Sequence, residues 1–317
     1  MLSVLRSSQP LAFVIVTITW VLGFILHFVS PIPEQCSWCI ANSESLLPQF
    51  SWISNLFLIL PAIALHRSYG NNEFAPHRNS LAVWLYILLG SIFCLLFPLH
   101  PYLIAQTLIA LALHQIWQVY RQGDAKHLYF NACLLLGCAA LVVPNASLLF
   151  IGTLVSLAYT RSGIWREWAW SLIGFLLPVA FLLTLLWFYN SLALVQYWVD
   201  HFGWNTKIQL TLSATVPITL LTLWGTKELL STYSASSNKS RNTKTTALFM
   251  SIAILLVALF ELSNNINLAW YFMLPVYSLL IPFIVLKEKR TWWMKSIFWA
   301  LLLWTTFSLV GLIFNVM

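Results

Sequence analysis

Two cysteines and two carboxylates gather in the stretch PEQCSWCIANSE, residues 33–44, which holds no lysine or arginine. Cys36 and Cys39 have the C-x-x-C spacing of a thiol-exchange site or of half a zinc site. No second C-x-x-C follows and no βαβ pattern surrounds this one, which argues against a thioredoxin-like site. We therefore predict a structural disulfide in an oxidising compartment, with a pair of free thiols as the alternative.

Glu34 lies only a few residues beyond the first apolar run of the chain. A carboxylate at such a boundary can reach into a cavity between helices, where partial dehydration tunes its pKa. There it can act as a general base that activates an acceptor hydroxyl for attack on a lipid-phosphate sugar. We predict Glu34 as the catalytic residue, and a solvated loop acid is the alternative interpretation.

Further polar residues lie beside other apolar runs and are predicted to bind substrate. They are His100 in PLHPYLIAQ, Asp200 and His201 in YWVDHFGW, Lys207 six residues beyond His201, and Glu261 in FELSNNINLAWYF. Imidazole and carboxylate groups can hold a divalent metal or a phosphate. Their spacing is not that of a metal site, so no metal ligand is predicted, and packing at a membrane boundary is the alternative.

The other polar residues are predicted to be structural. His114, inside ALALHQIWQVYRQ, is expected to form a hydrogen bond between helices, and Cys94, Cys133 and Cys138 to pack in apolar surroundings. Five acids have a lysine or arginine within a few residues and are interpreted as neutralised loop charges. They are Glu73, Asp124, Glu167, Glu228 and Glu288.

The composition of the chain places these residues in a membrane protein. Sixty per cent of the 317 residues are apolar, 8% are charged and the mean hydropathy is +0.81, whereas soluble domains carry roughly 25% charged residues. We predict an all-α bundle of about eleven spans, the first retained and not a cleaved signal. The apolar runs are 11–29, 50–65, 80–98, 102–119, 128–143, 147–160, 169–189, 208–224, 246–262, 267–286 and 296–315.

The positions of the cations orient this predicted bundle. With a cytoplasmic N-terminus and an outer C-terminus, fifteen of the sixteen lysines and arginines fall on the cytoplasmic side and only Lys207 lies outside. This is the pattern of the positive-inside rule. The net charge of +7 then reports orientation in a membrane, and we expect no nucleic-acid partner. The same count places residues 33–44 outside.

Polar segments divide the chain into regions. We predict a transmembrane region at 1–230 with an outer interfacial loop at 30–49, a flexible cytoplasmic linker at 231–245, and a three-span region at 246–317. No Walker loop, G-x-S-x-G, H-E-x-x-H or dinucleotide fingerprint occurs. ATP-driven transport, serine hydrolysis and dinucleotide chemistry therefore have no basis in the sequence.

The order of spans and loops over roughly residues 10–190 resembles the GT-C superfamily of membrane glycosyltransferases. In that family a span that ends in a basic R-x-G loop leads into a small-residue span, a short outer Pro turn, another span, a basic loop and a span ending in Pro. The positions that match this pattern are Tyr120, Arg121, Gly123, Gly137, Pro144, Arg166 and Pro178. The segments YRQGDA and WREWAWSLIGFLLP also resemble an uncharacterised family of bacterial multi-spanning proteins, which implies a location in the bacterial inner membrane.

The GT-C resemblance implies a transferase that uses a polyprenyl-phosphate sugar at the outer leaflet. Glu34 occupies the place of the family's acidic residue, which serves as catalytic base or metal ligand. A polyprenyl-phosphate donor, or a divalent metal, is then the expected cofactor, with membrane lipids as partners. The sequence leaves two alternatives open: a non-catalytic scaffold that binds other envelope membrane proteins, and a transporter or lipid flippase.

Overall fold

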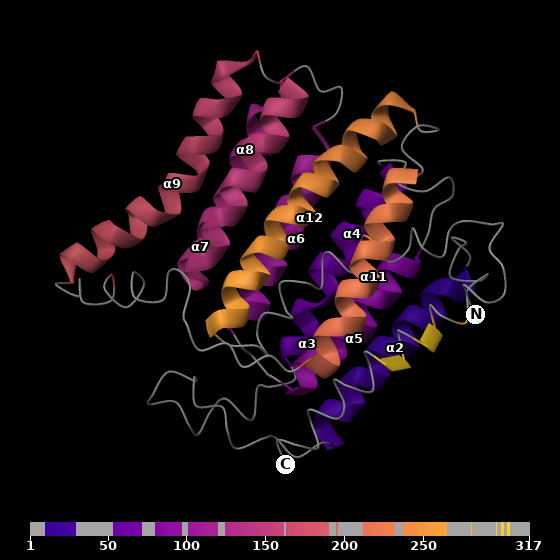
Figure 1. Ribbon diagram of the computed structural model, residues 1–317. Helices are drawn as coiled ribbons and strands as arrows, with labels where there is room; N and C mark the ends of the chain where they lie inside the picture. Colours follow the sequence, from indigo (N-terminus) through magenta and orange to yellow (C-terminus); the bar gives the residue numbers. More distant parts are fainter. Residues whose placement is uncertain are drawn as a thin grey trace.

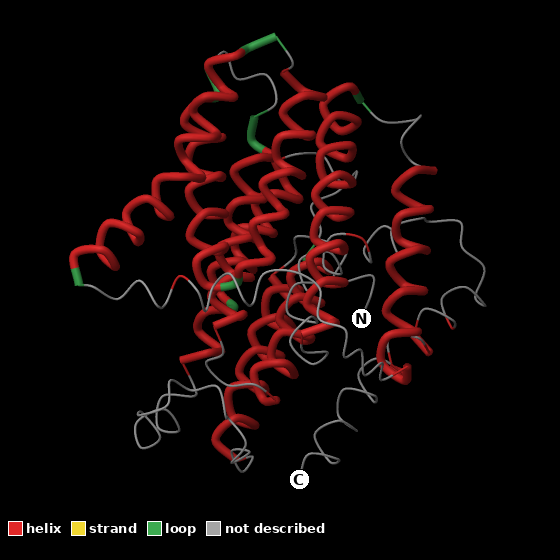
Figure 2. The backbone as a smooth tube through the Cα atoms, turned by 60° about the vertical axis from the view of Figure 1, so that its left-hand side comes forward, coloured by secondary structure: helices red, strands yellow, loops and turns green. Residues whose placement is uncertain are grey.

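The computed structural model describes the chain as a set of packed helices. The described residues are 10–29, 53–71, 80–96, 101–119, 124–161, 163–189, 212–231 and 237–264, with a few isolated positions elsewhere. Within these ranges every regular element is an α-helix or a 3₁₀ turn, and no strand occurs (Figure 2). The all-α class predicted from the sequence is confirmed for this part of the chain.

The helices follow the apolar runs of the sequence, and prolines mark where several of them begin. Pro10 is the first residue of α2 and Pro101 the first of α6, positions where a helix needs no backbone N–H. Pro144 opens the 3₁₀ turn η2 between α7 and α8. The elements are α2 (Pro10–Val29), α3 (Ile53–Phe57), α4 (Ile59–Asn71), α5 (Leu81–Leu96), α6 (Pro101–Trp117), α7 (Lys126–Val142), η2 (Pro144–Ser147), α8 (Leu148–Arg161), α9 (Trp165–Phe188), α11 (Leu212–Ser231) and α12 (Asn238–Asn264).

The helices pack side by side around one large apolar cluster, and a smaller separate cluster of Val119, Ala125, Leu128, Tyr129 and Leu157 lies near the start of α7. Helix α7 lies between α9 and α6, α8 packs on α12, α2 on α5, and α4 on α6. Helix α9 forms one flank of the molecule, with α2 on the opposite side (Figure 1). The largest wholly buried side chains are Trp117, Tyr86, Tyr129, Leu58, Leu65 and Leu81.

Two glycines allow α7 and α9 to lie in close contact. A Cβ atom added at Gly137 of α7 would lie 2.5 Å from the carbonyl oxygen of Phe175, and one added at Gly174 of α9 would lie 2.5 Å from that of Phe130. Each helix therefore presents a glycine to the backbone of the other. Small residues at such a crossing are typical of helices that pack in membranes.

The prediction of about eleven membrane spans is wrong. Among the described residues, two helices are long and apolar enough to cross a membrane, α9 and the segment Asn238–Phe260 of α12. Helices α5 to α8 have only 14 to 17 residues, about 21 to 26 Å at 1.5 Å per residue, against roughly 30 Å of hydrocarbon. An apolar run shows only that a segment carries no charge. A helix that is buried by its neighbours and a helix that faces lipid both lack charge, so the run does not distinguish them.

The sidedness predicted from the sequence depended on that span count. Each crossing reverses the side of every later loop, so the placement of fifteen cations in the cytoplasm no longer follows.

The structure also differs from the prediction at the predicted linker, residues 231–245. Helix α12 already begins at Asn238, where the backbone N–H of Ser240 donates to Ser237 Oγ at 3.3 Å, the geometry of an N-cap.

Candidate functional site

Most of the residues predicted to carry chemistry lie outside the described part of the chain. Glu261 belongs to α12, and the structure describes its backbone only. The structure therefore does not test the predicted catalytic and binding residues or the predicted disulfide. The residues outside the described ranges are Glu34, Cys36, Cys39, His100, Asp200, His201 and Lys207.

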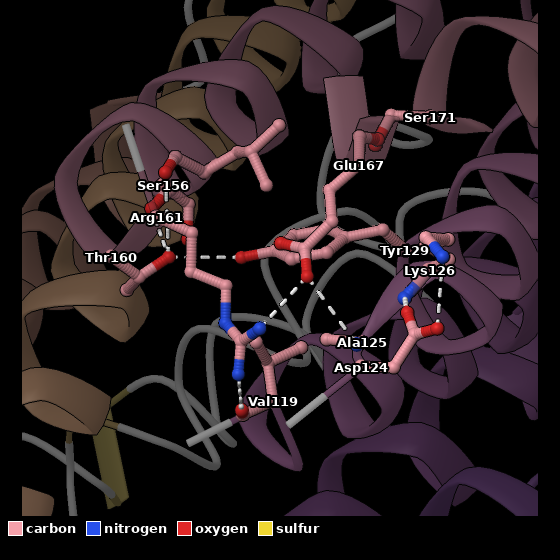
Figure 3. Close-up of polar contacts among 11 residues, drawn as sticks. Val119, Asp124, Ala125, Lys126, Tyr129, Ser156, Thr160, Arg161, Glu167 and Ser171 are labelled. Carbon is pink, nitrogen blue, oxygen red and sulfur yellow. Dashed lines mark hydrogen bonds and ion pairs between the residues drawn. The ribbon is translucent and has the colours of Figure 1, made fainter. Parts of the chain in front are cut away.

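A buried ion pair joins several helix ends within the described part of the chain. Arg161 is the last residue of α8, and its Nη1 donates to Glu167 Oε1 at 2.8 Å. Its Nη2 donates to the carbonyl oxygen of Val119, just past α6, at 3.4 Å. The backbone N–H of Ala125, just before α7, donates to the same Glu167 oxygen at 3.3 Å. Figure 3 shows these contacts converging from four segments.

The pair is removed from water. The side chain of Glu167 is 1% exposed and that of Arg161 13% exposed. Glu167 lies in the first turn of α9, where the helix dipole favours a negative charge. Its second oxygen, Oε2, has no hydrogen-bond partner among the described residues, so the pair is not bidentate. A buried carboxylate that loses its cation is strongly destabilising, so we assign this pair a structural role.

Further hydrogen bonds surround the pair. Tyr129 of α7 and Thr160 of α8 share a hydrogen bond of 2.9 Å between their hydroxyl groups. Ser171 Oγ donates to the carbonyl oxygen of Glu167 at 2.8 Å. Nearby, Lys126 Nζ lies 2.9 Å from Asp124 Oδ2 on the exposed surface. The hydrogen bond from the Lys126 side chain holds the pKa of the Asp124 carboxyl below its ordinary value.

A pocket opens beside the ion pair, between α6, α8 and α12. Its volume is about 160 Å³. It combines an indole, a guanidinium, an amide and hydroxyl groups with apolar side chains, so it suits a small polar ligand. The lining residues are Ile116, Trp117, Val119, Thr160, Arg161, Asn242, Thr243 and Thr246.

Helix α9 reverses the usual distribution of polar and apolar residues. Its buried residues are Glu167, Ser171, Gly174 and Pro178, which recur every three or four positions and so form one stripe. Phe175 stacks on Phe150 of α8, and Trp170, although exposed, meets the ring of Phe130 of α7 edge to face. The exposed bulky apolar side chains of α9 are Trp165, Trp170, Leu172, Ile173, Leu176, Leu177, Phe181, Leu183, Leu185, Trp187 and Phe188.

The family of the chain follows from a match over nearly its whole length. A family model described as a family of unknown function, DUF6427, matches residues 8–316. The chain belongs to the DUF6427 family. The predicted likeness to an uncharacterised family is thereby confirmed, while the GT-C resemblance of this DUF6427 chain stays a prediction. Comparisons with curated proteins and with solved structures found no match.

Some polar residues of this DUF6427 protein behave as the sequence predicted. Asp124 and Glu167 pair with neighbouring cations, although Glu167 is buried in a helix and does not lie in a loop. The predicted contact of His114 is confirmed, because its Nδ1 lies 2.6 Å from Ser68 Oγ and so joins α6 to α4. The 4-3-4 spacing of Glu167, Ser171, Gly174 and Pro178 was the signal that could have revealed the buried stripe.

Few groups that could carry chemistry converge among the described residues. Among the described residues, no group of three histidines, cysteines or acids is placed to hold a metal ion. Cys94 and Cys133 are buried free thiols, and Cys138 is a half-buried one. The polar groups that do converge are those of the ion pair and of the pocket beside it.

Proposed function

We propose that this protein is a multi-pass protein of the bacterial inner membrane and that α9 is in contact with lipid. The reversed pattern of α9 supports this proposal: small and polar residues form its buried stripe, and most of its bulky apolar residues are exposed. A surface helix in water has the opposite arrangement, and monomeric soluble proteins rarely expose so large an apolar face. Hydrocarbon is the solvent that suits it.

The two ends of α9 support the same placement. Trp165 lies at its start and Trp187 at its end, both highly exposed. They lie 22 positions apart, about 33 Å along a helix, which is close to the roughly 30 Å of a bilayer core. Tryptophans favour the two membrane interfaces, and Arg166 in the first turn of α9 favours a cytoplasmic position for that end.

Spin labels on α9 test this placement in the full chain, reconstituted in lipid after its native cysteines are replaced. A label at Phe181, which is 65% exposed, should collide more with oxygen than with a water-soluble relaxing agent. A label at the exposed Asp124 should do the reverse. If the water-soluble agent reaches position 181 as readily as position 124, α9 does not face lipid.

Within the membrane, we propose a non-catalytic scaffold role, as a partner subunit of an envelope complex. The described buried charges support this role, because Arg161 and Glu167 join the ends of packed helices. Such a protein should purify in mild detergent as a stable complex of fixed stoichiometry, and Glu34→Gln should leave both the complex and the growth of the cell unchanged. A chain that purifies alone from its native membrane would contradict the scaffold role.

A polyprenyl-phosphate-dependent glycosyltransferase is the second candidate function. Glu34 favours it, since it lies five residues beyond the end of α2 at Val29 and so stays near any membrane boundary that α2 meets. A transferase predicts that Glu34→Gln abolishes a glycan product while the amount of protein is unchanged. Glu44→Gln, in the same segment, is the matched control and should retain the product.

A further inference from the structure

The pocket between α6, α8 and α12 has features that neither the scaffold role nor the transferase role uses. Its volume of about 160 Å³ compares with the 10 to 15 Å³ that a cavity needs to hold one water molecule. A tetrahedral anion and the atoms next to it therefore fit. The walls come from three helices that are far apart in the sequence, so the folded chain builds the pocket.

The pocket carries hydrogen-bond donors, one of them a guanidinium whose charge is balanced by Glu167. The guanidinium of Arg161 and the indole of Trp117 lie in its wall, and both are donors without acceptor capacity. The amide of Asn242 adds a group that can donate. Arg161 is already held by Glu167, which fixes the guanidinium in place before a ligand arrives. A wall of this kind suits an anion with several acceptor oxygens.

Helix α12 adds a second cation on the same face. Lys239, Asn242, Thr243 and Thr246 recur at helical spacing, so the half-buried Lys239 shares the face that lines the pocket. Thr243 lines the pocket, and its Oγ1 donates to the carbonyl oxygen of Lys239 at 2.9 Å. Lys239 therefore lies one helical turn from the pocket wall. Arg241 lies on another, exposed face of the same turn.

We propose that this pocket binds a phosphate group, either that of an anionic phospholipid or inorganic phosphate. Basic pockets between membrane helices are suited to anionic headgroups. Of the two candidate spans in the described part of the chain, α12 lines this pocket and α9 carries the Glu167 that pairs with Arg161. Binding here depends only on the pocket, so the scaffold and the transferase roles can each fail without affecting it.

Asn242→Asp is the decisive variant, because it places a carboxylate in the pocket without a change of size and substitutes neither member of the ion pair. Asn238→Asp, at the exposed start of the same helix, is its matched control. Delipidated full-length protein is titrated with short-chain phosphatidylglycerol in one arm and with inorganic phosphate in the other. Unchanged circular dichroism and thermal midpoint confirm that each variant is folded.

We expect Asn242→Asp to weaken binding at least tenfold and Asn238→Asp to leave it near the wild-type value. Lys239→Gln should weaken binding about fivefold, the effect of one cation near the headgroup, and Arg241→Gln by less. Saturation by phosphatidylglycerol alone identifies the lipid as the ligand, and saturation by inorganic phosphate with the same variant pattern identifies the free ion. Absence of binding in both arms, or equal binding by Asn242→Asp and Asn238→Asp, overturns the proposal.

Discussion

Helices α9 and α12 are both long and apolar, yet the protein covers them very differently. Within the apolar window of α9, 17% of the residues are buried, against 56% for α12. Helix α9 buries one narrow stripe against α7, whereas α12 packs on α8 and continues over α6. Apolar composition therefore shows that a helix avoids water, while the positions of its small residues show which side other helices cover.

The largest effect is expected at the start of α9, where its attachment depends on a buried charge. Arg161→Ala removes the cation from Glu167, which is 1% exposed, and leaves an uncompensated buried carboxylate. Loss of one partner from such a pair costs about 3 to 5 kcal/mol. The thermal midpoint of the purified protein, followed by tryptophan fluorescence, should fall by many degrees.

The exposed pair of Asp124 and Lys126 provides the control for this prediction. Asp124→Asn should leave the midpoint unchanged, because water already solvates both charges. Arg161→Met combined with Glu167→Leu should recover part of the lost stability, since no unpaired charge remains. If Arg161→Ala is as mild as Asp124→Asn, the buried pair does not hold the helix ends.

The exposed face of α9 should respond to charge according to depth. Leu176→Lys places an ammonium near the centre of α9, where a lysine costs roughly 2.5 to 3.5 kcal/mol of membrane insertion. Phe188→Lys places it at the last residue of the helix, where the side chain can extend to the interface. The fraction of full-length protein that resists alkaline extraction from membranes should fall for Leu176→Lys and stay unchanged for Phe188→Lys. Equal loss in both variants would argue against a depth-dependent lipid contact.

The sequence allowed the helices to be predicted more reliably than their surroundings. The apolar runs at 80–98 and 102–119 correspond to α5 and α6, because local composition and breakers such as Pro101 determine where a helix begins and ends. Membrane spans could not be distinguished from buried helices in the same way, since both are apolar. The pairing of Glu167 with Arg161 was predictable from their separation, but its burial depends on how α7 and α9 pack.

The pocket shows the limit of such prediction more clearly. Trp117, Arg161 and Asn242 line it, yet no local pattern in the sequence connects them. Their proximity results from the packing of α6, α8 and α12. No spacing between residues along a single sequence reveals how these helices pack. The composition of the segment that contains Asn242 instead indicates a linker, because serines, threonines and lysines are typical of loops. Its N-cap at Ser237 was the local signal for a helix.

The close crossing of α7 and α9 should tolerate no added side chain. In Gly174→Ala the new Cβ would lie 2.5 Å from the carbonyl oxygen of Phe130, so the backbones must separate. Overpacking of this kind costs about 1 to 3 kcal/mol, measured as a lower thermal midpoint. Gly163→Ala is the matched control, because its added Cβ would meet no atom within 4 Å. A Gly174→Ala midpoint equal to that of Gly163→Ala would show that the two helices are not in close contact.

The smallest effect is expected where α12 meets α8, where the obstructing atom is the methyl carbon of an alanine and can be removed by substitution. A Cβ added at Gly152 would lie 2.6 Å from Ala253 Cβ, so Gly152→Ala should cost about 1 kcal/mol, the lower end of overpacking. Ala253→Gly removes that atom, and the double variant should regain the stability lost in Gly152→Ala. Additive losses in the two single variants would contradict this contact, since residues that touch are coupled by about 0.5 to 3 kcal/mol. Unlike at Gly174, where the backbone itself obstructs the new atom, a single compensating substitution is enough to restore the packing of α12.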